Sequence, residues 1–146
     1  MENAQLHKET VIFSPSFYTA RHGYKLVVSA ALNGDGKGYG KFMSVFVAIV
    51  KGEFDPIITW PFNHSVTFTL MDQTENVLER RHIRASVKPN PIKENLVFLG
   101  RPKKERNPSF GCQQFVDLTA LKTLNYVADD AIFLRVEIDE TNADWL

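Results

Sequence analysis

A glycine-rich turn between two apolar runs constrains the fold of this chain most strongly. The turn is Asn33-Gly34-Asp35-Gly36, with further glycines at positions 38 and 40. Before it, residues 24–32 place apolar side chains at every second position, as in a strand with one buried face. After it, residues 42–50 are apolar at nearly every position, as in a strand covered on both faces. Asn-Gly and Asp-Gly steps readily adopt positive backbone angles, so this stretch predicts a long antiparallel hairpin.

The rest of the chain carries short strand patterns separated by turn residues. Ser14-Pro15 interrupts the first pattern, and Asp117 before Leu118 is typical of the N-cap of one helical turn. The expected strands are residues 11–17, 66–71, 83–87, 96–99, 110–116 and 131–139. In the second of these strands, the expected inward residues are Val66, Phe68 and Leu70, and the outward ones are Thr67 and Thr69. About seven short strands with one short helical turn predict an all-β fold, an antiparallel β-sandwich.

The length and composition limit the number of domains, the partners and the cellular compartment that we expect. A length of 146 residues suits one domain. Its 17 basic and 17 acidic residues balance, which argues neither for nor against nucleic acid, and no nucleic-acid partner is expected. The single cysteine, Cys112, excludes an internal disulfide and fits a reducing compartment. No apolar run approaches the ~20 residues that span a bilayer, and residues 1–10 lack the apolar centre of a signal peptide. We expect a cytoplasmic protein.

No catalytic or metal-binding set emerges from the sequence. The four histidines are scattered and have no cysteine partner, which argues against a metal site. The glycines of residues 36–40 do not precede a helix, so they do not form a dinucleotide-binding turn. Ser44 stands where a calcium loop beginning at Asn33 would need a glutamate. Cys112 lacks the surroundings of a nucleophile, and neither a cofactor nor enzymatic activity is expected.

Several separate motifs occur in a specific order along the chain. They are IFSPSFYT at 12–19, GYKL at 23–26, LNGDG at 32–36, WPF at 60–62, DQ at 72–73 and NYVADDAIFLRVEI at 125–138. In these motifs the chain resembles the C-terminal domain of the TRAF family, the tumour necrosis factor receptor-associated factors. The resemblance covers nearly the whole chain apart from its variable middle and its last residues. It implies the meprin and TRAF homology (MATH) type of β-sandwich.

The start of the chain departs from the family pattern. TRAF domains open with a strand that carries a Trp-Lys pair and follows a coiled coil, and neither pattern occurs here. We therefore expect a polar arm at residues 1–10 and an N-terminally truncated TRAF/MATH domain at residues 11–146. An incomplete sequence and a natural short form both remain open. The resemblance implies an open edge beside the final strand, and a monomer or weak oligomer where the intact family forms a trimer.

The resemblance also implies a function, the binding of short extended peptides by strand addition. Such peptides come from receptor cytoplasmic tails or signalling partners, in ubiquitin-linked signalling of the TNF receptor and NF-κB type. Where receptor-binding members have an arginine and a tyrosine, this chain has Ser29 and Ala31, so we expect a peptide other than the common acidic motif. The positions implied in peptide binding are Ser29, Ala31, Asp35, Gly36, Phe46, Phe110, Gly111 and Cys112.

A basic stretch supports an alternative function. Residues 79–106 contain nine basic and three acidic side chains. The departures above resemble an atypical branch of the family that binds phosphoinositides, and clustered cations are attracted to anionic lipid. Lys103, Lys104 and Arg106 are the expected contacts of such a peripheral module at the plasma membrane. A third interpretation, a carbohydrate platform of Trp60 and Phe62, is disfavoured because these aromatics are expected to pack inward.

Overall fold

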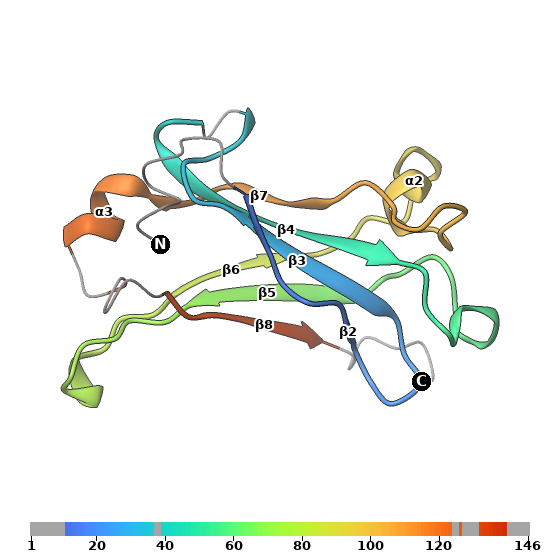
Figure 1. The fold of residues 1–146 in the computed structure, drawn as a ribbon, viewed down its shortest axis with the longest axis horizontal. Helices are drawn as coiled ribbons and strands as arrows, with labels where there is room; N and C mark the ends of the chain where they lie inside the picture. The colour runs from blue at the N-terminus through green and yellow to red at the C-terminus, as the bar shows by residue number, and fades with distance from the viewer. Residues whose placement is uncertain (1–10, 37–38, 124–125, 127–131, 140–146) are drawn as a thin grey trace.

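Two antiparallel sheets lie face to face in the computed structural model, which describes residues 11–36, 39–123, 126 and 132–139 (Figure 1). The larger sheet contains β1 (Val11–Phe13), β2 (Phe17–Tyr18), β3 (Lys25–Ala31), β4 (Phe42–Val50) and β7 (Phe110–Asp117). The smaller sheet contains β5 (Ser65–Leu70), β6 (Ile83–Val87) and β8 (Leu134–Asp139). The strand orders are β1-β3-β4-β7, with β2 also paired to β3, and β6-β5-β8. The predicted antiparallel sandwich is confirmed.

The predicted central hairpin consists of β3 and β4. The two strands pair without interruption from Lys25 opposite Val50 to Ala31 opposite Ser44. In the turn that follows β3, the Gly34 amide donates to the Ala31 carbonyl at 3.0 Å. Gly34 has a φ of 89°, which an L side chain rarely adopts. The glycine-rich sequence therefore forms this turn because the backbone has to enter the left-handed region.

Serine and proline divide the first predicted strand into β1 and β2. The Ser14 amide donates to the Val28 carbonyl at 2.8 Å, and the Ser14 hydroxyl accepts from the Val28 amide at 3.0 Å. The Ser14 side chain therefore accepts the hydrogen bond of the Val28 amide, and the strand is interrupted at the next residue, Pro15, which has no amide to donate. Both β1 and β2 pair with β3, so the two short strands together form one edge of the larger sheet despite the interruption.

The space between the sheets is filled by the inward residues of β3, β4 and β5 and by the loop that precedes β5. Phe62, from that loop, is fully buried, and the Tyr24 ring meets the rings of Trp60 and Phe62 edge to face at centroid distances of 5.0 and 4.8 Å. The two aromatics pack inward as expected, so Phe62 is unavailable as a carbohydrate platform. The largest fully buried side chains include Leu26, Met43, Ile49, Phe62, Val66, Phe68, Leu70 and Tyr126.

Short helices lie at the two ends of the sandwich (Figure 1). They are α2 (Leu96–Leu99), α3 (Leu118–Thr123) and the 3-10 turns η2 (Asp55–Ile57), η3 (Val77–Glu79) and η4 (Lys93–Asn95). The predicted helical turn after Asp117 is confirmed as α3, and the Asp117 carboxylate accepts from the Thr119 amide at 2.7 Å. The predicted strand at residues 96–99 is wrong, because these residues form α2. A run of four apolar residues is compatible with a strand or with a helical turn. Here the Asn107 side chain stabilises the helical turn by donating to the carbonyls of Phe98 and Gly100.

The exposure of one β5 residue differs from what its outward orientation suggests. Val66, Phe68 and Leu70 are fully buried as expected, but Thr69, expected to face outward, is also fully buried. In the pairing of the strands Thr69 lies between Arg84 and Arg135, and long side chains cover small neighbours with their apolar stems. Alternation assigns a residue to one face of the sheet, but it does not say whether neighbouring side chains cover that face.

Candidate functional site

A row of four residues crosses the outer face of the larger sheet. Phe13 pairs with Ser29, Ser29 with Phe46, and Phe46 with Gly111. Directly paired residues of an antiparallel sheet point to the same face, so β1, β3, β4 and β7 each contribute one residue. The row ends at β7, the last strand of this sheet, whose outer edge pairs with no other strand of the described residues.

A hollow of about 200 Å³ lies along this row. Ser29 and Ala31 are buried, and their small side chains leave the centre of the hollow open. Its other lining residues come from β1, β3, β4, the turn before β4 and the segment before β7. They are Val11, Phe13, Val27, Asp35, Phe46, Ala48, Arg106 and Ser109.

Two side chains of opposite charge border the hollow. Both Asp35 and Arg106 are exposed, and the Arg106 guanidinium lies 5.4 Å from the centre of the Phe13 ring. Asp35 accepts a hydrogen bond from the Gly36 amide at 2.8 Å, which orients its carboxylate at the end of the turn. The hollow therefore offers an apolar surface with a cation and an anion at its border.

Ser44 ties the turn that carries Asp35 to β7. Its buried hydroxyl accepts from the Asp35 amide at 3.0 Å and donates to the Gln113 carbonyl at 2.6 Å. This hydroxyl uses both its donor and an acceptor position, which fixes the turn relative to the strand. The geometry of Asp35 thus depends on Ser44, whose sequence position argued only against a calcium loop.

Gly111 allows β7 to approach β4 closely beside the hollow. A Cβ atom on Gly111 would lie 2.1 Å from the Val45 carbonyl oxygen, so no other residue fits without moving the strand. The side chains of Phe110 and Cys112 pack against the core on the other face. Their backbone groups face β4, because Asn107 donates to the Ile49 carbonyl and the odd-numbered residues of β4 therefore bond toward β7. By the same alternation Gly111 directs its amide and carbonyl to the outer edge of β7, where a ligand strand could pair.

The structure brings together most of the predicted peptide-binding residues. Ser29, Ala31, Asp35 and Phe46 line one hollow, Gly36 follows Asp35 in the turn, and residues 110–112 belong to the adjacent edge strand. The predicted lipid contacts are divided, because Arg106 lines the hollow whereas Lys103 and Lys104 do not. Phe13 was missed. In a short strand beginning at Val11, the position of Phe13 on the outer face is the signal that could have found it.

Other kinds of site find no support in the described part of the chain. Its histidine, cysteine, aspartate and glutamate side chains form no group of three that could hold a metal ion. None of its helices is long and apolar enough to cross a membrane.

Comparisons with known proteins identify the family. Residues 9–135 match the family described as TRAF/meprin, MATH domain. Human TNF receptor-associated factor 5 is 40% identical over 135 residues, covering 91% of this chain and 23% of that protein. Human TNF receptor-associated factor 2 is 39% identical over 131 residues, covering 89% and 25%. The chain thus spans about a quarter of these relatives.

The fold comparison agrees with the sequence comparison. The solved structure of TRAF5 from Notothenia coriiceps superposes with a TM-score of 0.85 at 30% sequence identity. The match covers 99% of this chain and 70% of that chain. The chain therefore shares both its sequence and its fold with these relatives, and it belongs to the TRAF/MATH domain family.

Proposed function

We propose that this domain is a signalling adaptor module that binds short extended peptides of receptor tails or signalling proteins. The peptide adds as a strand to the outer edge of β7, and one of its side chains enters the hollow between Phe13 and Phe46. The observation that carries this proposal is the position of the hollow, which Phe46 borders one strand in from β7, the edge strand whose outer side has no partner strand in the described residues. Backbone pairing provides general affinity, and the hollow selects the sequence.

The surroundings of the hollow define the preferred peptide. Ser29 and Ala31 carry no charge, so a charge-assisted hydrogen bond from β3, worth roughly 1.5–3 kcal/mol, is absent. Asp35 and Arg106 carry opposite charges, so together they favour a ligand side chain without net charge. The preferred peptide therefore places an apolar residue in the hollow and differs from the common acidic motif. The relatives' names supply the proposed setting of TNF receptor signalling, and we propose that the domain acts in the cytoplasm.

Fluorescence anisotropy with a panel of labelled receptor-tail peptides tests this function. Phe46→Ala should weaken binding at least tenfold, because it removes the aromatic wall of the hollow. Phe42→Ala is the matched control, since Phe42 lies on the same strand and face but outside the hollow, and it should leave affinity unchanged. Equal affinities of Phe46→Ala and the unaltered protein would contradict the proposal. Micromolar binding of the common acidic motif, abolished by changing Asp35, would overturn the proposed specificity.

A phosphoinositide-binding membrane module is the second candidate. Lys103, Lys104 and Arg106 are exposed within one loop, and no ion pair involves them among the described residues. Reversing these three charges should abolish sedimentation with phosphoinositide vesicles, whereas reversing Lys41 and Lys51 should not. Equal losses from the two variants would exclude a localised lipid site. Rising salt should weaken lipid binding steeply and peptide binding little, because exposed charges are screened.

A further inference from the structure

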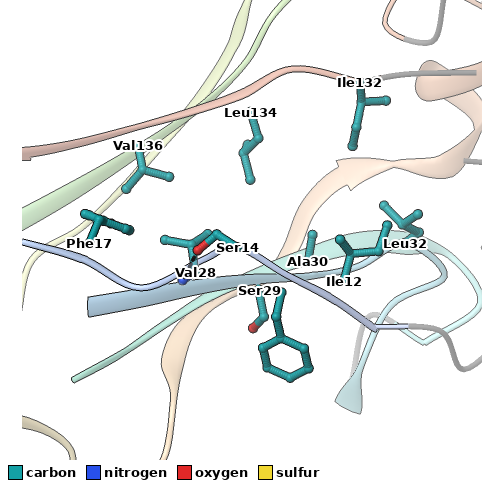
Figure 2. A pocket seen from close by; sticks show the side chains of 11 residues that line it. Ile12, Ser14, Phe17, Val28, Ser29, Ala30, Leu32, Ile132, Leu134 and Val136 are labelled. Carbon is teal, nitrogen blue, oxygen red and sulfur yellow. Dashed lines mark hydrogen bonds between the residues drawn. The ribbon is translucent and has the colours of Figure 1, made fainter. Parts of the chain in front are cut away.

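The outer face of the smaller sheet carries two arginines in one row across its strands. Arg84 of β6 and Arg135 of β8 each pair directly with Thr69 of β5, which lies between them. Directly paired residues of antiparallel strands point to the same face. Figure 2 shows Leu134 and Val136, on either side of Arg135, pointing toward the larger sheet, so Arg135 points away from it. The row therefore lies on the far side of the sandwich from the hollow beside β7.

Neither arginine has a firm partner for its charge. Both are exposed, and Arg84 forms no ion pair among the described residues. Arg135 contacts Glu137 at 3.4 Å, but the two side chains are 50% and 57% exposed, and exposed ion pairs contribute little. The two arginines lie two strand spacings apart, roughly 10 Å between their Cα atoms, so their long side chains can meet above Thr69. Two such cations attract an anion to this row.

Thr69 adds an unused hydrogen-bonding group between the two arginines. It is fully buried, and its hydroxyl has no hydrogen-bond partner among the described residues. One row away on the same face, the Thr67 hydroxyl does have a partner, the Ser86 hydroxyl at 2.8 Å. Buried polar groups are normally paired, so an unpaired hydroxyl between two cations indicates a partner that comes from outside the chain. An anion held by both guanidinium groups above Thr69 would accept from this hydroxyl.

We propose that Arg84, Thr69 and Arg135, here called the arginine row, bind the phosphate group of a phosphorylated residue in another protein. Each guanidinium can donate two parallel hydrogen bonds to phosphate oxygens, and the Thr69 hydroxyl donates one more. A phosphate monoester carries nearly two negative charges at neutral pH, which two arginines balance, whereas a carboxylate carries one. The arginine row therefore prefers phosphate to aspartate or glutamate. This site is independent of the peptide site at β7, which lies on the other sheet.

Glu137 defines the partner's sequence around the phosphate. It follows Arg135 by two residues on the same face of β8, a distance of about 7 Å along the strand. When Arg135 turns to the phosphate, Glu137 loses its contact with the guanidinium, and a cation of the partner can replace it. An extended peptide also advances about 7 Å in two residues, so the partner carries a lysine or arginine two positions from its phosphorylated residue.

The phosphates of an anionic membrane fit this face less well. Glu137 and Asp139 are exposed on the same face as Arg135. A lipid leaflet presents negative charge across the whole face, so these two carboxylates would oppose its approach. A single phosphate on a peptide contacts only the arginine row, and a neighbouring cation of the peptide compensates Glu137.

Fluorescence anisotropy tests the proposal with a labelled peptide that has one phosphoserine and a lysine two positions away on each side. The chain should bind this peptide at least tenfold more tightly than the same peptide with glutamate or unmodified serine at that position. Arg84→Gln and Arg135→Gln should each weaken binding at least tenfold, because each removes a bidentate contact. Arg101→Gln is the matched control, an exposed arginine outside the row, and should leave the affinity unchanged. Phe46→Ala should also leave it unchanged, which separates this site from the one at β7.

Thr69→Val separates phosphate binding from folding. It removes a hydroxyl that has no partner among the described residues, so it should weaken phosphopeptide binding about fivefold without destabilising the fold. Thr67→Val, one row away, should leave the affinity unchanged. Several results would overturn the proposal: equal binding of the phosphorylated and unmodified peptides, unchanged affinity in both arginine variants, or unchanged affinity in Thr69→Val. Sedimentation with phosphoinositide vesicles that Arg84→Gln abolishes, without phosphopeptide binding, would also overturn it and identify a lipid as the source of the phosphate.

Discussion

At the scale of single residues, Asp72 holds the segment between β5 and β6 through its carboxylate. Asp72 is 3% exposed and accepts hydrogen bonds from the amides of Thr74 at 2.9 Å and Arg81 at 2.8 Å. The side-chain hydrogen bond of Thr74 is the main cause that lowers the pKa of Asp72. The two amides and the charge of His82 lower it further, and burial opposes the shift. The charged carboxylate is therefore favoured in the folded state.

This lowered pKa predicts a pH-dependent contribution to stability. A depressed pKa stabilises the fold at pH values above the unfolded pKa, near 3.8, and the stabilisation disappears as the pH falls through the folded pKa. Asp72→Asn should lower the free energy of unfolding by roughly 1–3 kcal/mol at pH 7. Urea unfolding should show this difference narrowing below about pH 4. A difference that stays constant down to pH 3 would contradict the role of the charge.

Thr69 provides a second test at the same scale. Its hydroxyl is fully buried and has no hydrogen-bond partner among the described residues, whereas the Thr67 hydroxyl bonds to that of Ser86 at 2.8 Å. Thr69→Val should raise the free energy of unfolding by about 1 kcal/mol, because it removes an unsatisfied polar group. Thr67→Val is the matched control and should not raise the free energy of unfolding. Chemical denaturation of both variants measures these changes. A lower free energy of unfolding for Thr69→Val would contradict the prediction and indicate that the Thr69 hydroxyl has a hydrogen-bond partner.

At the scale of elements, the cap of α3 explains why this short helix forms directly at the end of β7. Asp117 ends the strand, and its carboxylate accepts from the Thr119 amide at 2.7 Å. Asp117→Ala should cost about 0.5–2 kcal/mol in the free energy of unfolding, while Asp117→Ser should retain most of the stability. Thermal unfolding of the two variants measures the difference. Equal losses in both would mean that the cap contributes little.

The elements also show what local sequence can and cannot predict. The central hairpin and β8 follow from glycine turns and from alternation, which are local signals. The helix at residues 96–99 does not follow from local signals, because it depends on Asn107, which lies outside that segment. The division of the first strand was predictable from Ser14-Pro15, since proline lacks the amide that a sheet requires.

At the scale of the whole molecule, the candidate site was predictable only in part. Asp35, Phe46 and Gly111 were assigned through the family resemblance, and the structure places them beside one another. Phe13 and Arg106 join them through strand pairing and the path of a loop, which connect residues far apart in the sequence. The resemblance predicted the open edge of β8, and among the described residues β8 is the last strand of its sheet.

The measurement that tests the central claim most directly is an amide proton–nitrogen correlation spectrum, titrated with receptor-tail peptides. Strand addition at β7 predicts dispersed peaks whose shifts concentrate at Phe46 and at residues 111–115. Those residues lie at the edge strand and the hollow. Dispersed peaks that respond to none of the peptides, or respond only along β8, would contradict a peptide-binding site at β7.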